Sequence, residues 1–191
     1  MIKYLLILLP LFGLSQDTVK VSNNYFDVIY SQKYKQPLKV TYSVLCNQKD
    51  STKYSRVGLT FKGYKGVITS TDADYINNNF DKGHLAPAED FDCDSLGIIS
   101  TFTYLNCALQ HYLLNRGVWK SLEEFERKLS INNTIRVEVI IEFKTNKRLK
   151  SGTLIPSGFT KTIYMNGKVF HSYYFPNIAP KYKAFTHYQI T

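Results

Sequence analysis

The strongest constraint on the fold is an amphipathic pattern between residues 114 and 129. The apolar residues on one face recur at steps of four, four, three and four: Leu114, Val118, Leu122, Phe125 and Leu129. This spacing places them on one face of an α-helix, where they pack toward a core. A second set recurs every four residues on an adjoining, mainly polar face: Asn115, Trp119, Glu123 and Arg127. The pattern therefore predicts a helix with separate packing and polar faces.

Most other patterned segments favour β-strands. Leu38–Leu45 and Arg136–Phe143 alternate apolar and polar residues, and Tyr25–Tyr30 is rich in Val, Ile, Tyr and Phe. Thr162–Val169 contains Asn166-Gly167, which predicts a hairpin with a tight turn. One clear helix among several strands predicts a mixed α+β domain.

Three further segments carry weaker signals. Gly58–Ile68 contains several glycines and is predicted as a strand with turns. Asp72–Asn79 is polar and predicts a short helix or a loop. Asp81–Phe91 contains Gly83 and Pro87, so we expect irregular structure or a strand edge.

The N-terminus has the layout of a secretory signal peptide. Lys3 precedes the apolar run Tyr4–Leu14, and small residues lie before Gln16. We predict a signal peptide over residues 1–15, with a buried N-terminal helix as the alternative. The run is shorter than the roughly 20 apolar residues that span a bilayer. Without repeats or linkers downstream, we expect one domain over residues 16–191, secreted or periplasmic, without stable membrane insertion.

Composition narrows the partners without choosing one. The 191-residue chain has a formal net charge of +9, from 24 Lys and Arg against 15 Asp and Glu. Such an excess favours nucleic acid, an acidic membrane surface or acidic glycans, although solvated lysines on an ordinary basic protein give the same composition.

The three cysteines are Cys46, Cys93 and Cys107. Export permits disulfides, and the odd number leaves at least one thiol free or paired between chains. Cys93–Cys107 is a possible bridge. The spacing matches no zinc motif.

Two clusters carry side chains suited to chemistry. In Asp81-Lys82-Gly83-His84-Leu85-Ala86-Pro87, a histidine follows a glycine that allows close backbone approach. With an ordinary pKa of about 6.5, His84 is a candidate general base near neutral pH. A structural or surface histidine is the alternative.

The second cluster is Asn106-x3-Gln110-x4-Asn115-x3-Trp119-x3-Glu123-x3-Arg127. Amide and carboxylate oxygens suit a hard cation such as Mg²⁺. Asn115 and Glu123 lie about 12 Å apart along a helix, at about 1.5 Å per residue, so we expect Glu123 to hold a water of the ion and not the ion itself. An ordinary amphipathic helix with a polar face is the alternative.

Together these clusters resemble the DNA/RNA non-specific endonuclease family, the ββα-metal nucleases. The family pattern is Asp-Arg-Gly-His followed by Asn-x3-Gln-x4-Asn-x3-Trp-x3-Glu, and the two elements match at 81–84 and 106–123 with the spacings intact. Later segments at 155–161 and 174–177 also resemble family elements. The resemblance implies an α+β, ββα-metal (His-Me finger) nuclease fold, with a central antiparallel sheet flanked by few helices.

The resemblance also implies roles for individual residues. Mg²⁺, or alternatively Mn²⁺, would be bound by Asn115, and His84 would act as general base on DNA and RNA. Glu123 would order the hydration shell of the ion, and Asn106 would help to position that shell or the phosphate. The expected phosphate contacts are Lys82, Arg127 and Arg56.

One departure from the family pattern keeps a second hypothesis open. Lys82 replaces the usual arginine, which retains the charge but loses bidentate phosphate geometry. The alternative is therefore a catalytically impaired, secreted nucleic-acid-binding relative. A secreted adhesion domain is a further rival, but it would leave the motif spacings as coincidence.

Overall fold

A computed structural model describes residues 17–47 and 49–191. Its main element is a six-stranded antiparallel sheet in the order β1-β2-β3-β6-β7-β8. The strands are β1 (Thr18–Ser22), β2 (Phe26–Ser31), β3 (Gln36–Ser43), β6 (Ile135–Glu142), β7 (Gly158–Met165) and β8 (Lys168–Pro176). The predicted signal peptide over residues 1–15 lies outside the described residues.

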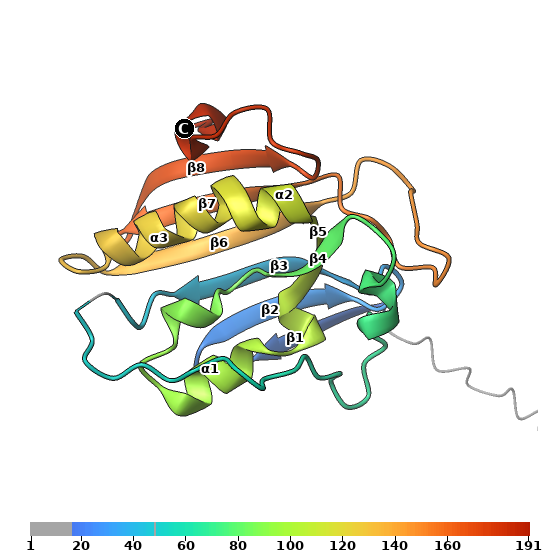
Figure 1. Cartoon of the computed structure of the whole chain (residues 1–191), viewed down its shortest axis with the longest axis horizontal. Helices are drawn as coiled ribbons and strands as arrows, with labels where there is room; N and C mark the ends of the chain where they lie inside the picture. Colours follow the sequence, from blue (N-terminus) through green and yellow to red (C-terminus); the bar gives the residue numbers. More distant parts are fainter. Residues whose placement is uncertain (1–16, 48) are drawn as a thin grey trace, which may run out of the picture.

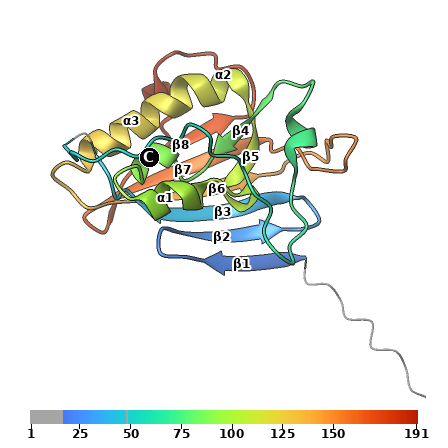
Figure 2. The ribbon, with the colours of Figure 1, turned by 60° about the horizontal axis from the view of Figure 1, so that its bottom comes forward.

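A second layer covers one face of this sheet (Figures 1 and 2). It contains a separate antiparallel pair, β4 with β5, and the helices that surround it. Its elements are β4 (Phe80–His84), α1 (Ser95–Thr101), β5 (Cys107–His111), α2 (Tyr112–Leu114) and α3 (Lys120–Leu129). Short 3-10 helices lie at Asp72–Tyr75 (η1), Ala88–Asp90 (η2), Tyr104–Asn106 (η3) and Phe185–Tyr188 (η5).

Alternation along the strands explains why only one face of the sheet is covered. In β6, Val137, Val139 and Ile141 are buried, whereas Arg136 and Ile140 are exposed on the opposite face. Such a period of two is expected of an antiparallel sheet with one solvated face. The strands predicted around residues 25–30, 38–45 and 136–143 are confirmed.

The predicted hairpin is also confirmed. β7 and β8 pair directly, and Met165 lies opposite Lys168. Asn166 and Gly167 both have positive φ, 52° and 81°, as a two-residue turn of this twist requires.

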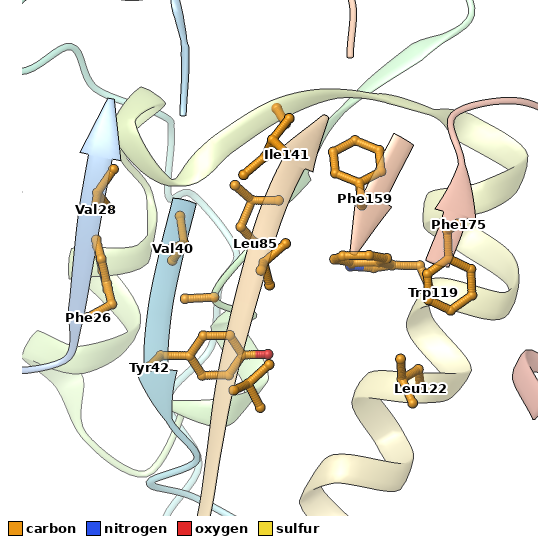
Figure 3. Packing of buried hydrophobic residues seen from close by; sticks show 14 of the residues in the cluster. Phe26, Val28, Val40, Tyr42, Leu85, Trp119, Leu122, Ile141, Phe159 and Phe175 are labelled. Atoms are coloured by element: carbon orange, nitrogen blue, oxygen red, sulfur yellow. The ribbon is translucent and has the colours of Figure 1, made fainter. Parts of the chain in front are cut away.

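The core fills the space between the sheet and the helices (Figure 3). Trp119 is fully buried against Phe159 and Phe175, at centroid distances of 5.5 and 5.6 Å. The polar face predicted for the helix is therefore wrong at Trp119, which points into the core with Leu122. The free energy gained by burying the large indole ring outweighs the four-residue spacing that placed Trp119 on the polar face.

The predicted helix over 114–129 forms, with an interruption. Residues Asn115–Trp119 adopt a wider π-helical turn, and Gly117 has non-helical angles of φ −106° and ψ −113°. Such turns are frequent at functional sites. This turn separates Asn115 from the regular helix α3.

Two other expectations differ from the structure. Residues 58–68 form a loop with turns in place of a strand, with one isolated bridge between Lys62 and Thr103. The possible Cys93–Cys107 bridge is wrong, because Cys46 bonds to Cys93 and Cys107 is a buried free thiol. Asp72–Asn79 begins with a short helix, as expected.

The Cys46–Cys93 disulfide is expected to contribute about 2–4 kcal/mol to the free energy of unfolding, because it closes a loop with a sequence separation of 47. Replacing both cysteines by serine should lower that free energy accordingly in urea titrations. Addition of a reductant should destabilise the wild type and leave the double variant unchanged. Equal stability of the two proteins under oxidising conditions would contradict the expectation.

No helix in the described part of the chain is long and apolar enough to cross a membrane.

Candidate active site

A pocket of about 520 Å³ lies between the end of β4 and the helix α3. Six of the seven predicted site residues line it: Arg56, Lys82, His84, Asn115, Glu123 and Arg127. They come from segments separated by up to 71 positions in the sequence. A pocket of about 570 Å³ on the β2–β3 side contains none of them.

Pairing of β4 with β5 places the histidine at the pocket. His84 lies opposite Cys107, and Gly83 lies opposite Ala108. A Cβ added to Gly83 would come within 2.3 Å of Gln110 Oε1 and 2.6 Å of Gln110 Cβ. The glycine of the motif is therefore required by close packing against β5.

His84 is held in an apolar environment. Its ring packs 4.7 Å from Phe61 and 4.8 Å from Phe102, measured between centroids. Burial lowers the pKa of His84 to about 4, and the positive charge of Arg56 acts in the same direction. The imidazole is therefore neutral at pH 7, as a general base must be.

The two ring nitrogens of His84 differ in their access to the pocket. Nε2 is buried and has no hydrogen-bond partner among the described residues. Since Nε2 is shielded and the side chain lines the pocket, Nδ1 is the nitrogen that a water in the pocket can reach.

Asn115 is oriented by a carboxylate. Its Nδ2 donates to Asp81 Oδ2 at 2.9 Å, which leaves Oδ1 as its remaining polar atom. Asp81 in turn accepts two bonds from Arg116, Nε at 2.8 Å and Nη2 at 2.7 Å. Burial alone would raise the pKa of Asp81, but the bonds from Arg116 and Asn115 lower it overall, so the carboxylate stays charged.

Asp81 and Arg116 were not among the predicted site residues. The signal for Asp81 was its place in the first motif, three positions before His84. Nothing in the sequence pairs it with Arg116, because the two residues meet only when β4 packs beside the π-helical turn.

Two basic side chains at the pocket are engaged by carboxylates. Arg56 Nη1 lies 2.7 Å from Glu89 Oε1, and Lys82 Nζ contacts Asp72. Exposed ion pairs of this kind contribute about 0–1 kcal/mol, so a phosphate can replace the carboxylate at little cost. Both side chains thus line the pocket without being held there by a strong ion pair.

Glu123 and Arg127 are less exposed to solvent than Arg56 and Lys82. Burial raises the pKa of Glu123 to about 8; Lys161 opposes this effect and Glu126 reinforces it. Arg127 donates Nη1 to the buried Asp90 at 2.7 Å, with 12% of its side chain exposed. Arg127 therefore faces the pocket with only part of its guanidinium.

Asn106 is the predicted residue that the structure places elsewhere. It is fully buried and is not part of the pocket lining. Its side chain accepts from Ala86 N at 2.8 Å and donates to the carbonyls of Ala86 and Thr101 at 2.8 and 3.1 Å. It holds the backbone after His84, and direct contact with a hydration shell or phosphate is excluded by its burial.

The fold is that of the ββα-metal nucleases. The structure matches a chain of the solved EndoG/EndoGI complex, described as showing the mechanism of EndoG inhibition, with a TM-score of 0.76 and 20% identity. The match covers 90% of this chain and 80% of that chain. The antiparallel sheet with few helices confirms the predicted α+β class.

The family is defined by the sequence. The family model for DNA/RNA non-specific endonucleases matches residues 9–190, and the chain belongs to this family. It is 38% identical over 61 residues to human mitochondrial endonuclease G, covering 32% of this chain and 20% of the relative. It is 33% identical over 64 residues to zebrafish (Danio rerio) mitochondrial nuclease EXOG, covering 34% and 19%. The matched regions thus span about a fifth of these relatives.

Proposed function

We propose that this protein is an exported, Mg²⁺-dependent endonuclease that hydrolyses DNA and RNA with little sequence preference. The observation that carries the proposal is the shared pocket of His84 and Asn115, in which the histidine is neutral and the amide is oriented by Asp81. Membership of the endonuclease family supports the same reaction class.

The residues of the pocket fit a hydrated Mg²⁺ ion. Since Asp81 holds the Asn115 nitrogen, the amide oxygen is the atom available to a cation. Glu123 lines the same pocket and would orient water of the hydration shell. Mg²⁺ keeps several waters and is usually held by few protein oxygens. A nearby divalent cation favours the charged carboxylate, which opposes the effect of burial on the Glu123 pKa.

The proposed chemistry is an in-line displacement at phosphorus. His84 Nδ1 accepts a proton from the attacking water as the new bond to phosphorus forms and the bond to the 3′ oxygen breaks. The 3′ oxygen takes up a proton from water, so the products carry a 5′-phosphate and a 3′-hydroxyl. Bound Mg²⁺ would neutralise the negative charge that develops on the phosphate and the leaving oxygen. Arg56 and Lys82 hold the substrate phosphates after releasing Glu89 and Asp72.

The substrate range follows from the kind of contact. Side chains that bind phosphates read no base sequence. The net charge of +9 adds salt-sensitive affinity for either polymer. Activity should therefore extend to DNA and RNA.

Export is supported by the pattern of residues 1–15. The Cys46–Cys93 disulfide agrees with an oxidising compartment. The names of the curated relatives place those proteins in mitochondria. Finding residues 1–15 on the mature, exported protein by N-terminal sequencing would contradict a cleaved signal peptide.

The first test is cleavage of circular plasmid and of RNA with Mg²⁺ or with EDTA. We expect both polymers to be cut with Mg²⁺ and neither with EDTA. Asn115→Ala should lower the rate by at least about 10-fold at limiting Mg²⁺, and more Mg²⁺ should restore part of it, since metal affinity is what the amide supplies. Asn24→Ala, at an exposed position between β1 and β2 and outside the pocket, is the matched control and should cut like wild type.

Two outcomes would contradict the proposal. A circle that stays closed with Mg²⁺, together with salt-sensitive binding, would favour the impaired nucleic-acid-binding relative. In that case Lys82→Arg, which restores the family residue, is the variant to assay next. Full activity in EDTA would overturn the metal-dependent mechanism.

A further inference from the structure

A strongly basic surface lies away from the candidate active site, where two distant segments meet. Residues 32–35 connect β2 to β3, and residues 143–157 connect β6 to β7. Neither segment contains Asp or Glu. We call their six basic side chains the basic end of the sheet: Lys33, Lys35, Lys144, Lys147, Arg148 and Lys150.

Specific contacts hold the two segments together. Leu154 N donates to Tyr34 O at 2.9 Å, and Lys35 Nζ donates to Ser151 O at 2.9 Å. Between them lies a pocket of about 350 Å³, whose lining includes Lys33, Lys144 and Arg148. These contacts therefore hold the basic side chains of the two segments close together in the folded structure.

Arg148 is positioned by neutral groups. Nη1 donates to the carbonyl of Gly152 at 2.7 Å and to that of Lys33 at 3.3 Å. The guanidinium carbon lies 5.8 Å from the centroid of the Tyr34 ring, which packs against Phe143. Because its partners carry no charge, the guanidinium keeps its full positive charge at the pocket.

Few carboxylates compensate this surface. In the described part of the chain, the six side chains make one ion pair, between Lys144 Nζ and Glu142 at 2.8 Å. Two further carboxylates lie close. Asp74 is buried and accepts bonds from Thr153 Oγ1 at 3.0 Å and Thr71 N at 2.8 Å. Asp17 accepts from Lys33 N at 2.6 Å and offsets part of the charge beside that lysine. An excess of positive charge therefore faces solvent.

The basic end is connected to the candidate active site through one short helix. In η1, Asp72 contacts Lys82 of the active-site pocket, and Asp74 bonds to Ser151 and Thr153 of the β6–β7 loop. Figures 1 and 2 both show this loop beside the segment that contains η1. One polyanion can therefore reach both places by passing over η1.

We propose that the basic end binds the phosphate backbone of the substrate nucleic acid at a distance from the cleaved bond. The inference rests on the proposed function and adds a second binding region to it. An extended polymer of phosphates can occupy both regions at once, whereas a lipid headgroup would fill only the small pocket. Lysine contacts to phosphates extend the affinity without adding sequence preference.

The test compares two triple variants with the same change of charge. Lys33, Lys144 and Lys147 are replaced by glutamine, which spares Lys35 and Arg148 with their backbone bonds. The control replaces three exposed lysines elsewhere, Lys20, Lys128 and Lys168, by glutamine. Affinity for a duplex of about 30 base pairs is measured by fluorescence anisotropy in EDTA at several salt concentrations.

We expect the basic-end variant to bind the duplex about 10-fold more weakly or worse, with the salt slope reduced by about 2–3, near one for each lost contact. The control should stay within about twofold, apart from the small effect of total charge. With Mg²⁺, both variants should cut a substrate of about four nucleotides like wild type, since so short a chain offers few phosphates beyond those held at the active site.

The outcomes separate this inference from the proposed function. Equal loss in both triple variants would show a general charge effect and overturn the inference, as would unchanged duplex affinity of the basic-end variant. Loss of binding to phosphatidylserine vesicles without loss of duplex affinity would assign the surface to membranes instead. Wild-type protein that neither binds nor cuts DNA would overturn the proposed function itself.

Discussion

Replacing His84 by alanine is expected to lower kcat for plasmid and RNA cleavage by about 10²–10⁴-fold, the usual contribution of a general base. The neutral imidazole is the group in the pocket that can take a proton from water, because burial lowers its pKa and keeps it unprotonated at pH 7. Affinity for uncut duplex in EDTA should change little, since the proton transfer takes place only during reaction.

The same variant offers a positive control. The ring of His84 lies between Phe61 and Phe102, so its removal leaves a space the size of imidazole. Free imidazole added to His84→Ala should restore part of the activity. His187→Ala, which removes an exposed histidine, should cut like wild type. A His84→Ala protein with more than about a tenth of wild-type kcat would exclude His84 as the base.

Replacing Lys161 by methionine is expected to lower the free energy of unfolding by about 3–5 kcal/mol. Lys161 Nζ is fully buried, 2.9 Å from Glu126 Oε1, as an ion pair without aligned hydrogen-bond geometry. It also lies 4.5 Å from the centroid of Trp119. Without the lysine, the buried charge of Glu126 has no counter-ion. The resulting decrease in the free energy of unfolding is measured by urea titration.

A second variant separates an unpaired charge from a loss of packing. Tyr42 OH donates to Glu126 Oε2 at 2.8 Å, so all three polar groups are removed together in Lys161→Met, Glu126→Leu, Tyr42→Phe. This variant should recover most of the stability, because a buried ion pair is often replaced by apolar residues at no net cost. Lys168→Met, on the exposed start of β8, should change the free energy of unfolding by less than about 0.5 kcal/mol. If the triple variant is as unstable as Lys161→Met, lost packing explains the effect.

Lys161 also bears on the candidate active site. It exerts the largest favourable charge effect on Glu123, whose pKa burial raises to about 8. Glu126 and Asp90 act on the same carboxyl group in the opposite direction. The buried cluster beneath the pocket thus connects the stability of the core with the charge state of a side chain proposed to orient water.

Local pattern was sufficient for the central strands and the hairpin. Alternation in 136–143 and the turn residues Asn166-Gly167 predicted a strand and a hairpin that both form, because the strand period and the sign of φ depend on nearest neighbours. Pattern failed at 58–68, where glycines at positive φ terminate any strand. It also failed at Trp119, whose size favours the core over the polar face.

Motif spacing identified most of the pocket but not its supports. His84, Asn115 and Glu123 were found from their positions in the two motifs, and they line one pocket. Asn106 belongs to the same motif, yet it bonds to the backbone of Ala86 instead of facing the pocket. Residue type and spacing alone do not distinguish a side chain that contacts substrate from one that supports the chain behind it.

By itself the sequence determined most strands of the large sheet, the main helix, the order of the motifs and membership of the nuclease family, because these depend on short-range periodicity and residue identity. Only the tertiary structure decided the Cys46–Cys93 pairing, the Asp81–Arg116 support of Asn115 and the basic end of the sheet. Each of these joins residues at least 34 positions apart. Such contacts exist only once the sheet and its covering layer have packed, since local conformational preferences act over a few residues and carry no information about distant partners.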